Sequence, residues 1–518
     1  MRKKYITKKM AATYVAVELA IVMLGSLIGM KRIALLCLAI FVLAILMIIS
    51  EIFSRSTTAM FSAFLTLLVL MAIGGFSPTH IVHEYVEMGT ILTLLGIMVV
   101  ASFGLKSGLF YFIGMKVAKI SKGDPLMLYF ILAVFTFILN IFLIAVATIV
   151  VVVSLTLAIC DMLKIDPRPY VIMEIFVVNV CASATMISAV PNIIIAEIAN
   201  LQYLFFIVYL LPFTFLFLLV NIWILYSANP PPTVIDKMRA MAILEVDEWW
   251  FVKDKKEFYV SAFCIAGIII SFMISRELML LSILFAAIAL AAYPKTEELI
   301  REVDWDTLLF LIGFYIIVAG LSITGILYGI ANGLVRLSMG NIHILIALLF
   351  WISVLISGFV DNIPYVLMVV QIIEIIITKE PYSHYGYIFW ILLILACNIG
   401  GGLNPYSAPQ NLLALSMARK ARYPIVTGDY YRISIKWTII GSSLAYIYLV
   451  MLVVSPGIIA RIGYLNYIVT LLVSIISIAI IFIHKTIGIR RFIEHIERFL
   501  KQTKRQISIL LQKIKKMQ

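Results

Sequence analysis

Apolar residues form long, uninterrupted blocks along most of this 518-residue chain. Many blocks reach about 20 residues, the length that an α-helix needs to cross roughly 30 Å of hydrocarbon. The sequence lacks the alternating segments of about 10 residues that a transmembrane β-barrel requires. The pattern predicts an all-α polytopic membrane protein with about 12 transmembrane helices. We expect the crossings near 11–30, 32–53, 56–75, 89–104, 170–199, 203–227, 258–275, 277–293, 305–328, 385–418, 433–455 and 464–484.

Two further apolar stretches, near 125–160 and 342–378, fit re-entrant hairpins better than single crossings. The first is too long for one crossing and carries Asn140 among bulky apolar residues, and the second turns at Asp361-Asn362-Ile-Pro364. A carboxylate near the middle of a bilayer costs roughly 2.5–3.5 kcal/mol, so we expect Asp361 to face a partner or a transport pathway. The alternative is a structural role for Asp361 as the cap of a half-helix N-terminus.

Polar residues within the apolar blocks recur at a nearly constant spacing, which indicates an internal repeat. An offset of 217 aligns Val86–Thr90 with Val303–Thr307, Gly96 with Gly313 and Gly108 with Gly325. Asn140 falls opposite Asn362 at an offset of 222. At an offset of 219, Asn179, Ser188, Ala189 and Asn192 fall opposite Asn398, Ser407, Ala408 and Asn411.

Each copy of the repeat holds five crossings, and five is odd, so the second copy must be inverted. Inverted repeats are the architecture of many secondary transporters, whereas a duplicated scaffold without a transport role is the alternative. The chain then divides into an additional N-terminal helix (1–31), inverted repeat 1 (32–227), a cytoplasmic linker (228–257), inverted repeat 2 (258–455), and an additional crossing with a basic amphipathic tail (456–518).

The segments 179–192 and 398–411 interrupt the crossings at 170–199 and 385–418. They concentrate Asn, Ser, Thr, Gly and Pro, which are poor formers of a spanning helix. Unwound backbone at membrane depth is tolerated only where protein or a water-filled cavity satisfies it, so these segments are candidate ion or solute sites. We expect no catalytic residue and no metal site. The candidate substrate- or ion-binding residues are Asn140, Asn179, Ser183, Thr185, Ser188, Asn192, Asp361, Asn362, Asn398, Gly400, Gly401, Asn404, Ser407 and Asn411.

Composition supports a membrane protein, because 63% of the residues are hydrophobic and 13% are charged, against roughly 45–50% and about 25% in soluble domains. The net charge of +13 reflects topology rather than nucleic-acid binding. With the N-terminus inside, most Lys and Arg residues lie on the cytoplasmic side, which is the positive-inside pattern. We therefore expect a multi-pass cell-membrane protein with both termini cytoplasmic.

Other sequence features limit the function classes. The chain has no Gly-Lys pair and thus no P-loop, so it is not expected to be an enzyme that hydrolyses nucleotides, and any ATPase would be a separate subunit. We expect no cofactor, with H⁺ or Na⁺ as the coupling ion. All five cysteines lie in apolar segments, which argues against a disulfide framework. The tail repeats apolar residues every three or four positions among Lys and Arg, which is typical of an amphipathic or oligomerisation helix.

Several motifs together resemble the ion-transporter superfamily, in the branch of arsenite-efflux permeases, NhaD-type sodium/proton antiporters and citrate-transporter-like proteins. The resemblance runs from about residue 51 to about residue 452. It is carried by Glu51-Ile-Phe-Ser-Arg-Ser-Thr, Val303-Asp-Trp-Asp-Thr-Leu-Leu-Phe-Leu-Ile-Gly313, Asp361-Asn-Ile-Pro364 and the two interrupted segments. It implies that the hairpin tips and unwound loops bind substrate and coupling ion, in a transport domain that moves against a dimeric scaffold.

The chain departs from the family pattern in its first half. The first hairpin carries Leu139-Asn140 where the family usually has Asp-Asn, and the first loop lacks the usual paired glycines. We expect a secondary transporter for a small ion, of the arsenite or anion efflux or sodium/proton antiport type, with an elevator-like mechanism and a homodimeric assembly. A di- or tricarboxylate transporter and a non-transporting membrane sensor or anchor are the alternatives.

Overall fold

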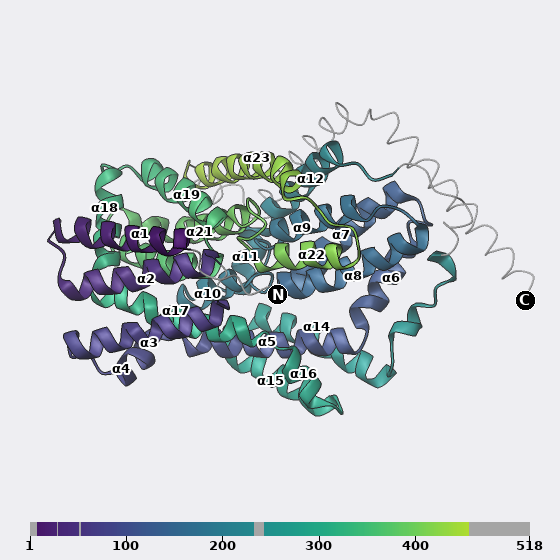
Figure 1. The fold of residues 1–518 in the computed structure, drawn as a ribbon. Coiled ribbons are helices and arrows are strands. Elements are labelled where there is room, and N and C mark those ends of the chain that lie inside the picture. The colour runs from purple at the N-terminus through teal and green to yellow at the C-terminus, as the bar shows by residue number, and fades with distance from the viewer. Residues whose placement is uncertain (1–7, 28, 51–52, 233–242, 455–518) are drawn as a thin grey trace, which may run out of the picture.

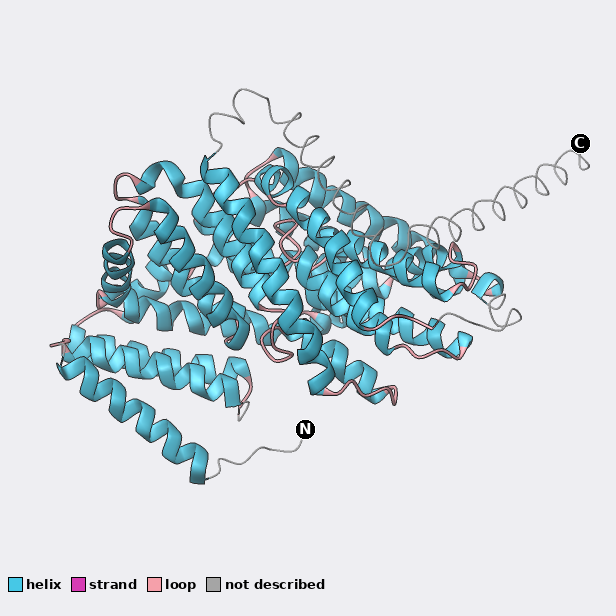
Figure 2. Ribbon diagram, turned by 90° about the horizontal axis from the view of Figure 1, so that it is seen from above, coloured by secondary structure: helices cyan, strands magenta, loops and turns pink. Residues whose placement is uncertain are grey.

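The computed structural model describes residues 8–27, 29–50, 53–232 and 243–454. The crossing expected at 464–484 and the basic tail lie outside the described residues. Within the described part every regular element is a helix, as Figure 2 shows. The first half contains α1 (Lys8–Leu27), α2 (Arg32–Ser50), α3 (Arg55–Gly74), α4 (Pro78–Tyr85), α5 (Met88–Lys106), α6 (Leu109–Lys119), α7 (Pro125–Phe142), α8 (Ala145–Leu163), α9 (Arg168–Cys181), α10 (Val190–Ile198), α11 (Tyr203–Tyr209) and α12 (Leu211–Ala228).

The second half runs from teal through green to yellow in Figure 1. Its helices are η1 (Glu248–Phe251), α14 (Lys255–Ile274), α15 (Leu278–Ala292), α16 (Thr296–Glu302), α17 (Trp305–Ile323), α18 (Ile326–Leu337), α19 (Ile342–Phe359), α20 (Asn362–Ile377), η2 (Tyr382–Tyr385), α21 (Gly386–Gly400), α22 (Pro409–Lys420) and α23 (Thr427–Val454).

The helix lengths agree with a polytopic membrane protein. Eleven described helices are long and apolar enough to cross a membrane, and the number is twelve if α10 and α11, bent by 114°, count as one span. The expected crossing at 203–227 is divided at Leu210 into α11 and α12, with Pro212 in the first turn of α12. Proline suits that position because the first-turn N–H groups of a helix have no intrahelical acceptor.

The repeat is visible in the helix boundaries. The starts of α5, α6, α7 and α8 each precede the starts of α17, α18, α19 and α20 by 217 residues. This offset holds through both hairpins, so the alignment of Asn140 with Asn362 at 222 is wrong. Asn140 lies before the hairpin break, and its structural counterpart is Ser357; Asp361, after which α20 begins, corresponds to Ile144. The sequence alignment paired two asparagines that are not equivalent, because Asn140 lies before the break of its hairpin and Asn362 lies after the break of the other hairpin.

Helices of the two repeats pack against each other to form a common framework. α3 lies along α17, and α15 lies along α5 (Figure 1). Both contacts need a glycine: a Cβ at Gly96 would lie 2.6 Å from the backbone of Ser282, and one at Gly313 would lie 2.7 Å from the backbone of Ala59. The repeat-related glycines therefore mark two equivalent close approaches of backbone.

The hairpins and interrupted helices form a second bundle, which meets the framework where α20 contacts α17 and α10 contacts α5. α7 and α8 pack on α9, and α19 and α20 pack on α21. The two central helices are enclosed almost completely, with 169–181 of α9 and 388–400 of α21 buried. Their buried residues are largely apolar, as expected of helices surrounded by protein or lipid, and the polar exceptions include Glu174 and Asn179 on α9 and Asn398 on α21.

Candidate functional site

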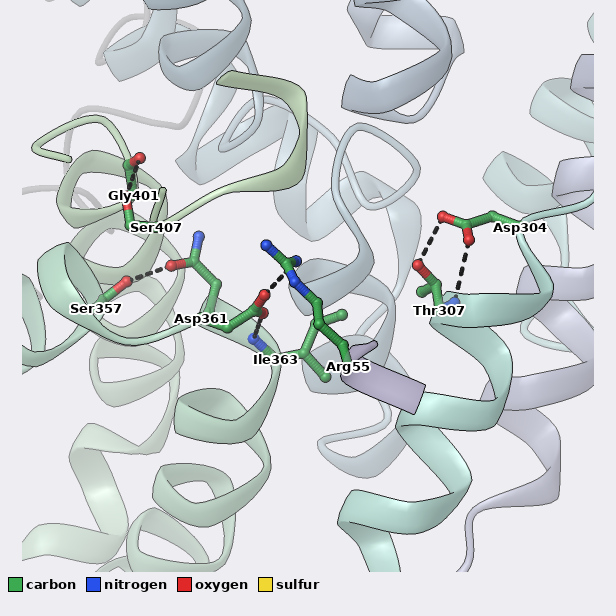
Figure 3. Close-up of polar contacts among 9 residues, drawn as sticks. Arg55, Asp304, Thr307, Ser357, Asp361, Ile363, Gly401 and Ser407 are labelled. Carbon is green, nitrogen blue, oxygen red and sulfur yellow. Dashed lines mark hydrogen bonds and ion pairs between the residues drawn. The ribbon is translucent and has the colours of Figure 1, made fainter. Parts of the chain in front are cut away.

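Two unwound loops lie where α9 gives way to α10 and α21 gives way to α22. Each loop contains a serine that donates to two loop carbonyls. Ser188 Oγ donates to the carbonyls of Ala182 (2.9 Å) and Thr185 (2.6 Å). Ser407 Oγ donates to Gly401 (2.8 Å; Figure 3) and to the Asn404 carbonyl (2.7 Å). These hydroxyls satisfy backbone groups that the ends of α9 and α21 leave without intrahelical partners.

The asparagines that follow the loops donate hydrogen bonds to the same loop carbonyls. Asn192 Nδ2 donates to Ala182 O at 2.6 Å and to Thr185 O at 2.7 Å. Asn411 Nδ2 donates to Gly401 O at 2.9 Å. Both side chains are fully buried. The repeated Ser and Asn residues thus hold the loops in shape, which is a structural role that the sequence pattern alone does not distinguish from ligand binding.

The two interrupted helices meet through a reciprocal pair of amide contacts. Asn179 Nδ2 donates to Asn411 Oδ1 at 2.7 Å, and Asn398 Nδ2 donates to Asn192 Oδ1 at 3.1 Å. The residue before each break therefore contacts the residue after the other break. This arrangement requires the two elements to run antiparallel where they cross, as inverted repeats predict.

Each hairpin tip docks against the loop of its own repeat. Asn140 Nδ2 donates to the carbonyls of Leu143 (2.8 Å) and Ser188 (3.2 Å), and Ala145 N donates to Ser188 O. In the second repeat, Ser357 Oγ donates to Asn362 Oδ1 (2.6 Å; Figure 3) and lies 2.8 Å from the Cys397 carbonyl. The two tips and two loops therefore converge on one region of the bundle.

A cavity of about 190 Å³ lies at this convergence. The first turns of four helices, α8, α10, α20 and α22, form one part of its wall through residues such as Ala145, Val190, Asn362 and Gln410, and α5 and the start of α17 form most of the rest. The N-terminus of each helix carries a positive partial charge and N–H groups without intrahelical acceptors. Four such termini at one cavity favour a negatively charged ligand, although Ala145 N and Ile363 N already donate to Ser188 O and Asp361 Oδ1.

Three of the predicted site residues line the cavity: Asp361, Asn362 and Asn398. The others lie outside its wall. Several of these hold the loops or tips through the hydrogen bonds above, and Gly400 and Gly401 allow close packing, because a Cβ at Gly401 would lie 2.7 Å from Asn362 Nδ2. The residues outside the wall are Asn140, Asn179, Ser183, Thr185, Ser188, Asn192, Gly400, Gly401, Asn404, Ser407 and Asn411.

Asp361 forms an ion pair that the sequence did not predict. Arg55 Nη1, at the start of α3, lies 2.5 Å from Asp361 Oδ2 (Figure 3). The Asp361 side chain is 3% exposed and that of Arg55 is 26% exposed. Asp361 also caps α20, because its Oδ1 accepts from Ile363 N at 3.1 Å. Both roles considered for Asp361 are thus present, and the pair joins the framework to the second hairpin tip.

Two more carboxylates lie in the cavity wall near the start of α17. Asp304 caps this helix by accepting from Thr307 N (3.1 Å) and Thr307 Oγ1 (2.6 Å; Figure 3). Glu302 pairs with Lys106 at 2.6 Å. Sequence reasoning missed Glu302, Asp304 and Gln410 as wall residues and Arg55 as the partner of Asp361, although Arg55 and Asp304 both lie in motifs that carry the family resemblance.

The family is settled by a sequence match that spans most of both repeats. A model of the citrate transporter family matches residues 41–384. The chain belongs to the citrate transporter family. This confirms the resemblance and identifies the protein as a transporter rather than an enzyme.

Relatives of this citrate transporter family member are also transporters or membrane proteins. It is 26% identical to an uncharacterized transporter of Mycobacterium tuberculosis, over 80% of this chain and 98% of that protein. It is 27% identical to a 46 kDa membrane protein of Mycobacterium leprae, over 80% and 97% of the two chains. The crystal structure of the Alcanivorax borkumensis YdaH transporter shares its fold, with a TM-score of 0.50 and 13% identity over 74% of this chain and 88% of that one.

Proposed function

We propose that this member of the citrate transporter family is a secondary transporter for a small anion that carries carboxylates. The convergence of four helix N-termini on the cavity carries the proposal, because backbone N–H groups can bind carboxylate without a Lys or Arg in the wall. The cavity, at about 190 Å³, is smaller than the roughly 300–1,000 Å³ of pockets that hold drug-sized ligands. Its size favours a small metabolite or an ion.

The Arg55–Asp361 pair suggests how a coupling cation takes part. A proton or Na⁺ that binds Asp361 competes with the Arg55 guanidinium for the same carboxylate. The released guanidinium offers a planar, bidentate donor set to a carboxylate of the substrate. Cation and anion would then strengthen each other's binding, which is the linkage that symport needs.

The division into two bundles supports alternating access by an elevator-like motion. In this proposal the bundle of α7–α10 and α19–α22 moves against a framework of α2, α3, α5, α14, α15 and α17. The ion pair at 2.5 Å joins these two parts and must break or rearrange when they move. The cavity lies toward the ends marked by Lys106 and Glu302, which we expect to be cytoplasmic, so the described form would face inward.

A second candidate is cation/proton antiport, favoured by the three carboxylates Glu302, Asp304 and Asp361 in the cavity wall. Flux measurements with the full chain in proteoliposomes separate the two. We expect citrate or a related di- or tricarboxylate to be taken up with an inward H⁺ or Na⁺ gradient. Na⁺/H⁺ exchange or arsenite transport without any carboxylate flux would overturn the proposal, and absence of every flux would favour a sensor or anchor.

A further inference from the structure

Glu174 is a carboxylic acid enclosed in the middle of α9. Its side chain is fully buried, and its Oε1 accepts from Thr156 Oγ1 on α8. Its Oε2 is buried and has no hydrogen-bond partner among the described residues. An ionised carboxylate in such a place costs far more free energy than a neutral one. A buried oxygen without a partner in a membrane transporter needs an explanation.

No cation stands near this carboxyl group in the described part of the chain. α7, α12 and α21, which pack on α9, contain no charged residue, and Arg419 and Lys420 lie in the last turn of α22. The titratable side chains on these helices and on α8 are Tyr129, Cys160, Asp161, Tyr226, Tyr387, Cys397, Arg419 and Lys420. α9 itself carries Arg168, Tyr170 and Cys181.

A proton suits this position better than a metal cation. One hydroxyl is the hydrogen-bonding neighbour of Glu174 among the described residues, and no group of three His, Cys, Asp or Glu residues among them could hold a metal. Hard cations require several oxygen ligands, whereas a proton needs one carboxylate oxygen. Oε2 supplies that oxygen.

The second repeat shows that the fold does not need a polar pair here. At the repeat-related positions, Thr156 corresponds to Ile373 and Glu174 corresponds to Leu393, and both apolar side chains are fully buried. Replacing both partners of a buried hydrogen bond by apolar groups of similar shape is often nearly neutral for stability. The polar pair in the first repeat is therefore best explained by function.

Glu174 is also placed to connect protonation with the site. It lies five residues before Asn179, roughly 7.5 Å along the helix axis, and Asn179 contacts the second loop through Asn411. Its partner Thr156 lies on α8, whose first turn lines the cavity. Toward the other end of α9, the partly exposed Asp166 pairs with Arg168 at the start of the helix.

We propose that Glu174 is a proton-binding site of the transporter, loaded from water on one side of the membrane and emptied to the other. One proton adds to Oε2, and the side-chain charge changes from −1 to 0, so no other reactant is needed. Loss of the proton leaves a buried charge that only rearrangement of α8 against α9 can solvate. This inference rests on the proposed transport function, because Glu174 would be a second coupling group of the transporter beside Asp361.

Infrared difference spectroscopy of the purified full-length protein after a pH jump tests the proton site without any substrate. We expect a carboxylic-acid C=O band that titrates in the wild type and is lost in Glu174→Gln. The matched control is Glu197→Gln, because Glu197 also accepts from a threonine (Thr93, 2.8 Å) but is half-buried on α10. A titrating band that survives in Glu174→Gln and disappears in Glu197→Gln would overturn the proposal.

Proteoliposomes loaded with citrate test the coupling role. We expect Glu174→Gln to lose uptake driven by a pH gradient and to keep citrate counterflow, which needs no gradient. If Glu174→Gln misfolds, the double variant Thr156→Ile with Glu174→Leu reproduces the packing of the second repeat and serves instead. Retained proton-driven uptake in a folded variant would make Glu174 structural. No carboxylate flux in the wild type would instead reject the proposed substrate, and the infrared result would still decide on Glu174.

Discussion

The two repeats share a frame and differ in their chemistry. The break between α7 and α8 and the break between α19 and α20 lie at equivalent positions of the two repeats. In both repeats a Ser and an Asn hold the unwound loop. At the hairpin break the first repeat has Ile144 where the second has Asp361. In the enclosed central helices the first has Glu174 where the second has Leu393.

This difference separates two kinds of residue. The shared Ser, Asn and Gly residues satisfy loop carbonyls or allow backbones to approach, so they build the site. The unshared acids Asp361 and Glu174 bring charge to only one repeat each. The two acids proposed to bind a coupling cation therefore lie where the repeats disagree, whereas the helix N-termini proposed to bind the anion are common to both repeats.

The largest expected effect concerns the inversion itself. A cysteine at Lys122 or Asp166 should react with a membrane-impermeant maleimide only from the cytoplasmic side, and one at Arg336 or Lys379 only from the outside. The native cysteines in the described residues are all buried, so background labelling should be low. Labelling of the Lys122 and Asp166 positions from opposite sides would make the first hairpin a true crossing, and the inverted relation between the repeats would fail.

A second prediction compares substitutions at the equivalent positions of the two hairpin breaks, Asp361 and Ile144. Asp361→Asn leaves Arg55 without its partner at the tip. Removing one member of a desolvated charge pair costs about 2–5 kcal/mol, so coupled flux should fall by about 30-fold or more. Ile144→Asn, the equivalent change in the first repeat, should keep most of the coupled flux. Equal losses in both variants, with monodisperse protein by gel filtration, would show that the carboxylate is not what matters.

The sequence predicted the parts of the structure that have local signals. The bilayer dictates the length of the apolar blocks, and Gly, Pro and Asn mark the breaks, so the helical class and the interrupted elements could be placed. Whether the two hairpins are re-entrant stays a prediction. Repeat-related glycines such as Gly108 and Gly325 adopt the same left-handed φ of about 80°, a conformation that favours glycine. Their recurrence was a reliable signal for that reason.

The chemistry of the site was less predictable. The Arg55–Asp361 pair joins residues 306 positions apart, so no local sequence pattern predicts it. Ser and Asn look alike in sequence whether they bind a loop carbonyl or a substrate. Glu174, in contrast, did have a signal, because it is an isolated carboxyl in a helix of apolar residues, and the sequence reasoning overlooked it.

The third prediction tests whether the framework contacts are as equivalent as they look. Gly96→Ala and Gly313→Ala each place a Cβ less than 3 Å from backbone of the other repeat. Overpacking of this kind costs about 1–3 kcal/mol, and we expect similar losses of thermal stability in detergent for both. Gly329→Ala on α18 is the control, because a Cβ there meets nothing within 4 Å. A large loss for one framework glycine and none for the other would break the symmetry.

The smallest expected effect compares the ends of α6 and α18. Lys119 on α6 bonds Glu248 of the linker, whereas Asn332 on α18 bonds Lys379 of its own repeat. The hydrogen bond from Lys119 lowers the pKa of Glu248. The pair should therefore stabilise the protein above the ordinary Glu pKa of about 4.3 and lose this contribution as the pH falls through the lowered value.

Glu248→Gln should thus lower the melting temperature slightly at neutral pH and make no difference in acid. Such partly exposed pairs contribute about 0–1 kcal/mol, so a small shift is expected. Glu245→Gln, an exposed residue of the same linker, is the control because other carboxylates also titrate in acid. A difference between wild type and Glu248→Gln that persists at low pH would mean that the linker docks on α6 through packing, such as the Phe112–Trp249 contact, rather than through charge.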